Sequence, residues 1–160
     1  MTISEVSDQE LSRWIAEKLE PEPEKINEHG DSRGGWWLWC YQHRLHGTEI
    51  VDTGKWQPRN VVNDPALTVK LIEHSGFVSL FLLEDGKEPC IYHAEFCGAV
   101  SHSLDCGENM RVASNPDPGR AIAEAFALAN GWIENSIERL AREDPATAKW
   151  IAEDPDLADE

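Results

Sequence analysis

The sequence predicts an α+β fold in which helices pack on a small antiparallel sheet of about three or four strands. Helix start signals recur along the chain, first as a Ser-x-x-Glu capping box and then as Asp-Pro pairs. Two runs of strand-forming residues flank an Asp-Gly turn, which is typical of a hairpin. A length of 160 residues, 41% of them apolar, supports one hydrophobic core.

The first helix begins after Ser7, whose hydroxyl caps a free N–H while Glu10 reaches back to the cap residue. Its apolar face repeats at helical spacing and consists of Leu11, Trp14, Ile15 and Leu19. Pro21 and Pro23 end it, and the Glu-Pro-rich stretch that follows predicts an extended, solvated linker.

A second helix begins at Asp64-Pro65, with the aspartate as N-cap and the proline at the first helical position. Its buried stripe consists of Leu67, Leu71 and Ile72. Gly76 is a suitable residue for the end of this helix.

The sheet is expected next along the chain. Residues 77–83 and 90–96 read as two strands of a hairpin, because both are rich in strand formers and an Asp-Gly turn lies between them. Residues 109–114 predict a short third strand, and the sequence leaves its pairing open.

Asp117-Pro118 repeats the helix start signal, and Asn130-Gly131 marks the end of that helix. Its broad apolar face consists of Ala121, Ile122, Ala125, Phe126 and Ala129. We therefore expect a single α+β domain over residues 1–132, a helical extension over residues 133–153 and an acidic tail over residues 154–160.

The chain carries 30 acidic and 14 basic residues, a net charge of −16, and this charge is unevenly spread. Residues 1–30 sum to −5 and residues 131–160 to −6, whereas residues 31–60 sum to +1. Acidic surfaces repel phosphates, which argues against direct nucleic-acid binding. The sequence contains no apolar run long enough to cross a membrane and no signal peptide, so we expect a cytoplasmic protein.

Residues 31–60, which form a near-neutral insert, hold four of the seven tryptophans. The aromatic and basic residues of this insert are the candidate binding surface. Trp and Arg are enriched in interface hot spots, whereas Trp is also highly buried on average. On a strand, Trp37 and Trp39 would share one face and Trp36 would take the other. Core packing and binding both stay open for this set, which comprises Trp36, Trp37, Trp39, Arg33, Arg44 and Arg59.

Signals for chemistry are weak. Cys40, His43 and His46 have a zinc-like spacing, but a strand would point Cys40 and His43 to opposite faces, and no paired Cys-x-x-Cys accompanies them.

A nucleophilic set can be assembled from Cys97 or Cys106 with His102 and Asp105, yet the local signatures of catalytic cysteines are missing. No catalytic carboxylate pair and no phosphate-binding loop stands out, so we expect no enzyme activity, no cofactor and no bound metal.

The sequence resembles the phage ABA-sandwich domain family, which comprises small proteins of phage and prophage genomes. The resemblance covers roughly residues 8–132, and three stretches carry it: LSRWIAEK from Leu11, NDPALTV from Asn63 and GRAIAEAFALA from Gly119. It implies helices packed on a sheet and a phage or prophage origin, and it transfers no catalytic motif. Residues 28–59, an idiosyncratic loop or strand pair, and the helices after Trp132 depart from the family.

Together these features predict a non-enzymatic phage or prophage accessory protein that binds a host or phage protein, with a homodimer left open. One alternative is an acidic nucleic-acid mimic that inhibits a host defence nuclease of the restriction or CRISPR type. A small zinc-dependent or cysteine-dependent enzyme is the third reading.

Overall fold

The computed structural model describes residues 2–26, 30–46, 49–74, 76–83, 90–98 and 110–133, with the backbone alone for residues 42–46 and 49–53. It confirms the α+β class, with helices beside a two-stranded and a three-stranded antiparallel sheet. The expected helical extension and acidic tail lie outside the described residues, apart from Ile133.

The three α-helices in the described part of the chain begin at the capping residues that the sequence indicated. Helix α1 (Asp8–Leu19) follows the Ser7 capping box, α2 (Pro65–Glu73) is capped by Asp64, and α3 (Pro118–Ala129) is capped by Asp117. A short 3-10 turn, η1 (Ile3–Glu5), precedes α1.

The three-stranded sheet has the order β3-β4-β5, with strands Phe77–Leu83, Ile91–Cys97 and Met110–Asn115. The expected hairpin is confirmed, because Leu83 pairs with Ile91 in an antiparallel register. The third strand, whose pairing the sequence left open, lies against β4, with Ala94 opposite Ala113.

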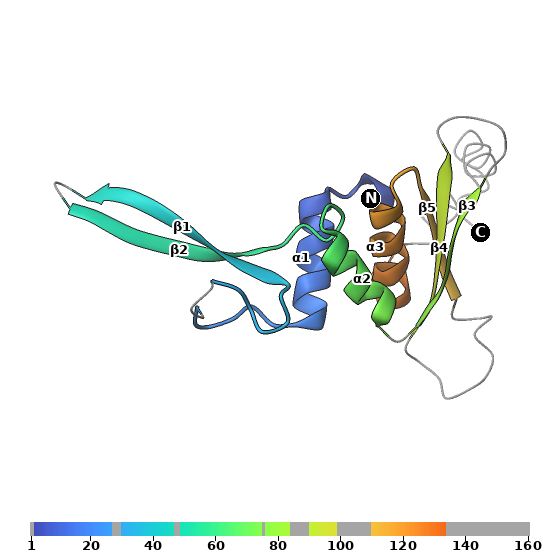
Figure 1. The fold of residues 1–160 in the computed structure, drawn as a ribbon, viewed down its shortest axis with the longest axis horizontal. Coiled ribbons are helices and arrows are strands. Elements are labelled where there is room, and N and C mark those ends of the chain that lie inside the picture. The colour runs from blue at the N-terminus through green and yellow to red at the C-terminus, as the bar shows by residue number, and fades with distance from the viewer. Residues whose placement is uncertain are drawn as a thin grey trace, which may run out of the picture.

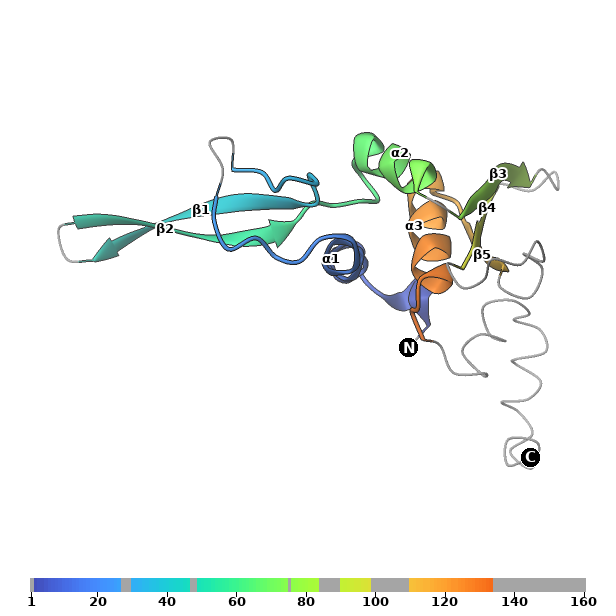
Figure 2. The ribbon, with the colours of Figure 1, turned by 90° about the horizontal axis from the view of Figure 1, so that it is seen from below.

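Helix α3 lies between the three-stranded sheet on one side and helices α1 and α2 on the other (Figures 1 and 2). We call these three layers the body of the protein. On the sheet side of α3 the Phe96 and Phe126 rings meet edge to face, with centroids 5.7 Å apart. A helix that is covered on several sides needs apolar residues around most of its circumference. Ten of the twelve residues of α3 are buried, and the two charged ones among them, Arg120 and Glu124, pair with each other.

The insert between α1 and α2 forms a long antiparallel ribbon, β1 (Trp37–His46) and β2 (Glu49–Pro58), in register from Trp37 opposite Pro58 to His46 opposite Glu49. It projects from the helical side of the body, away from the three-stranded sheet (Figures 1 and 2). Of the two readings of this segment, loop or strand pair, the structure shows the strand pair. We call it the β1–β2 arm.

Candidate functional site

The base of the arm is built into the core. Trp37 is fully buried, its backbone N–H donates to the Ser32 hydroxyl (3.1 Å), and its indole N–H donates to the Glu20 carbonyl (3.0 Å). Trp56 on β2 is also buried. These contacts tie the first residues of the arm to the end of α1.

Trp36 lies just before the arm and is buried as well. The Lys70 ammonium of α2 sits 5.9 Å from the centroid of its ring and donates to the Gly34 carbonyl (2.8 Å). A cation over an indole face is attracted by the ring quadrupole. Trp36 and Lys70 therefore join the start of the arm to α2.

Beyond the base, aromatic side chains run along one face of the arm. The Trp39 ring meets the Trp56 ring edge to face at 5.4 Å, and Tyr41 follows Trp39 at 6.4 Å. A Cβ atom on Gly54 would lie 2.5 Å from the Trp39 ring, so glycine is required where this indole covers β2. Tyr41 ends the described part of this row and is 62% exposed.

The opposite face of the arm also carries an apolar side chain at the surface. Leu38 is 42% exposed and, with Cys40, borders a shallow pocket of about 300 Å³ where β2 leads into α2. Leu38 and Tyr41 thus place exposed apolar surface on both faces of the arm.

The structure brings only part of the candidate set to the surface. Trp36 and Trp37 are buried, Trp39 is partly exposed and Arg33 is exposed. The Arg59 guanidinium pairs with the Asp64 carboxylate at 2.9 Å, and the Arg44 side chain is outside the described part. A binding role for the whole set stays a prediction.

Sequence reasoning overlooked Tyr41, Leu38 and Gly54. The alternation of Trp37, Trp39 and Tyr41 was a readable signal, because residues two apart share a strand face. No sequence signal marked Gly54, whose role depends on the cross-strand register.

The candidate metal ligands lie on β1, where alternation directs Cys40 and His43 to opposite faces. The side chains of His43 and His46 lie outside the described part. Within the described residues no group of three or more His, Cys, Asp or Glu side chains is placed to hold a metal ion.

The other chemical candidate is only partly described. Cys97 ends β4, and the other residues of the nucleophilic set, His102, Asp105 and Cys106, lie outside the described part. Cys40 and Cys90 are free thiols.

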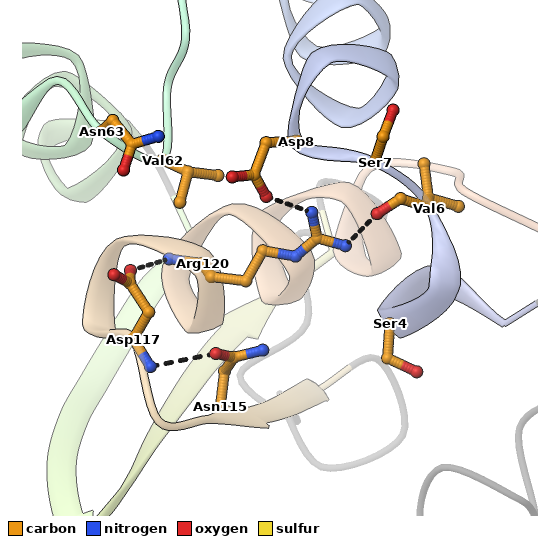
Figure 3. A pocket seen from close by; sticks show the side chains of 9 residues that line it. All are labelled: Ser4, Val6, Ser7, Asp8, Val62, Asn63, Asn115, Asp117 and Arg120. Carbon is orange, nitrogen blue, oxygen red and sulfur yellow. Dashed lines mark hydrogen bonds and ion pairs between the residues drawn. The ribbon is translucent and has the colours of Figure 1, made fainter.

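A polar pocket of about 340 Å³ lies where α1, the start of α3 and the end of β5 meet (Figure 3). The Arg120 guanidinium donates to the carboxylates of Glu124 (2.6 Å) and Asp8 (2.7 Å) and to the carbonyls of Ile3 (2.8 Å) and Val6 (2.7 Å). These bonds use four of its five N–H groups on the protein itself. Arg120 therefore ties the N-terminus to α3.

Sequence and structure comparisons give no further identification. No family model matches the chain, and no curated protein or solved structure shows significant similarity to it. None of the helices in the described part of the chain combines the length and apolarity that crossing a membrane requires.

Proposed function

We propose that the chain is a non-enzymatic binding protein, of the phage or prophage accessory type that its sequence resembles, and that the β1–β2 arm contacts a host or phage protein. One observation supports this most. Along the outer arm, which we define as residues 41–54, β1 and β2 pair only with each other among the described residues. An isolated two-stranded ribbon is marginally stable in water. A partner that covers the arm would supply the missing contacts.

The side chains near the base suit such a contact. Exposed Tyr41 extends the row of Trp39 and Trp56, and exposed Leu38 lies on the other face. Tyrosine is enriched among the residues that dominate binding energy at protein interfaces. Tyr41 is therefore the main proposed contact residue, and Leu38 adds exposed apolar surface on the other face.

The test is affinity capture with quantitative mass spectrometry from a lysate of the cells that carry this protein. The double variant Leu38→Ala, Tyr41→Ala is expected to lose the proteins that the unmodified chain captures. Val69→Ala is the control, because it truncates an exposed apolar side chain on α2, away from the arm. Circular dichroism checks that each variant is folded.

Unchanged capture by the double variant would overturn the proposal. The same result would favour the acidic mimic, since a mimic binds through carboxylates and does not need Leu38 or Tyr41.

A further inference from the structure

The open edge of β1 gives a more specific picture of the partner, and this inference rests on the proposed function. At the base of the arm, residues 30–32 already lie along this edge and form an isolated antiparallel bridge with it, between Asp31 and Leu38. The Ser32 N–H donates to the Trp37 carbonyl (3.1 Å) and the Trp39 N–H to the Gly30 carbonyl (2.7 Å). The β1 edge therefore accepts an antiparallel strand.

The same edge continues beyond Trp39. Along an antiparallel strand, backbone groups alternate between the two neighbours. The backbone groups of Trp37 and Trp39 bond to residues 30–32. By alternation, the backbone groups of Tyr41, His43 and Leu45 point to the same side of β1. In the described part of the chain no strand pairs with this stretch of the edge.

The edge of β2 is less suited to an added strand. Pro58 lies opposite Trp37, so it belongs to the positions that face away from β1 and offers no N–H at the base of that edge. The β1 edge already accepts residues 30–32 at this level, so we expect the added strand on β1.

Charge next to the β1 edge indicates what kind of strand would bind. Asp31 forms a backbone β-bridge with Leu38 on the β1 edge. It also lines a cleft of about 660 Å³ beside the base of the arm. Four carboxylates line this cleft against two basic side chains; the carboxylates are Glu20, Glu22, Glu24 and Asp31, and the basic residues are Lys25 and Arg33. A basic segment is attracted there, whereas a second copy of a chain with a net charge of −16 is repelled.

We infer that the partner contributes an extended, basic peptide segment that adds as a strand to the β1 edge from Tyr41 to Leu45, with its body-proximal end beside the acidic cleft. Backbone hydrogen bonds would supply much of the affinity, as in other cases of strand addition. The acidic cleft would select segments that carry Lys or Arg.

Two proline variants separate the two edges. His43 and Asp52 lie opposite each other, and alternation turns both N–H groups outward, His43 on the β1 edge and Asp52 on the β2 edge. His43→Pro removes a donor from the proposed site, and Asp52→Pro removes one from the other edge. Proline is tolerated at such edge positions because no ladder hydrogen bond is lost.

An arm-shortened variant completes the set. It replaces residues 41–54 with Asn-Gly and so joins Cys40 to Lys55, which are paired across the arm. Asn-Gly is a favoured two-residue hairpin turn. The Trp39–Trp56 contact is retained.

The probes are ten-residue peptides selected from a random displayed library on the full chain. We expect the selected peptides to be enriched in Lys and Arg. Their Kd should rise at least tenfold with His43→Pro and with the arm-shortened variant, and should change less than twofold with Asp52→Pro. Methylation of every second backbone nitrogen of the peptide gives two peptides, one for each alternating set. The peptide whose methylated nitrogens would face β1 should lose binding, a test that leaves the protein unaltered.

The inference is overturned if no peptide is selected, if the peptides lack basic residues, or if the two proline variants weaken binding equally. When only the arm-shortened variant loses binding, the arm still binds but the β1 edge is not the site. Peptides that bind the arm-shortened variant unchanged contradict both the inference and the proposed function.

Discussion

Helix α3 and the β1–β2 arm are the two extremes of this molecule. Helix α3 is surrounded by the sheet on one side and by α1 and α2 on the other, and nearly all of its residues are buried. The arm is anchored by Trp37 and Trp56 at its base, and its exposed side chains begin with Leu38 and Tyr41. Since burial provides most of the stability of a fold, the contrast separates a scaffold that stabilises itself from an element available for contact.

The largest expected effect concerns the body. Arg120→Met is expected to lower the free energy of unfolding by about 3 to 5 kcal/mol, because it removes the guanidinium that pairs with the buried carboxylate of Glu124. Chemical denaturation measures the change. Arg13→Met is the matched control, since the Arg13–Glu17 pair is exposed and exposed pairs contribute about 0 to 1 kcal/mol. Equal losses in the two variants would contradict the role of Arg120.

Gly54→Val tests the fit of the arm itself. The new side chain would collide with the Trp39 ring, and overpacking of this kind costs about 1 to 3 kcal/mol. We expect a change in tryptophan fluorescence. We also expect the arm to unfold more readily than in the unmodified chain, as measured by hydrogen exchange of its backbone amides. Lys55→Val places the same side chain on the adjacent exposed residue and should leave both readouts unchanged.

Tyr41→Ala is expected to change the free energy of unfolding by less than about 0.5 kcal/mol, because its side chain lies largely in solvent. Thermal denaturation measures this value. A large loss of stability would mean that Tyr41 supports the fold, and the contrast between arm and body would fail.

The smallest effect is the pH dependence at the start of α1. The Ser7 hydroxyl and backbone N–H donate to the Glu10 carboxylate and lower the pKa of Glu10 from its usual 4.5. The resulting stability is present above the unfolded pKa and is lost as the pH falls through the lower folded pKa. Ser7→Ala should therefore raise the pKa of Glu10 in an NMR titration. An unchanged pKa would contradict this assignment.

The comparison also explains which parts of the fold could be predicted from sequence. The capping box at Ser7 and the Asp-Pro pairs at residues 64 and 117 are local signals, and the helices begin there. The Asp-Gly turn likewise predicted the β3–β4 hairpin. The pairing of β5 with β4 depends on contacts between distant residues, and no local pattern encodes it.

The run of tryptophans led us to place the candidate site in residues 31–60, and its binding role stays a prediction. The sequence did not indicate which indoles are buried, because burial depends on contacts with distant residues. Trp37 meets Glu20 at the end of α1, and Trp36 meets Lys70 of α2. The outer edge of β1, which no strand of the described residues pairs with, can be recognised only once the strand pairing is known.

We expect the body to fold without residues 41–54, the outer part of the arm, and we expect these residues to make the contact with the partner. The most direct measurement is quantitative capture by the arm-shortened variant at matched concentration, with its unfolding midpoint recorded alongside. We expect a midpoint within a few degrees of the full chain and at least tenfold less captured partner. A folded arm-shortened variant that captures the same amount of partner would contradict the claim.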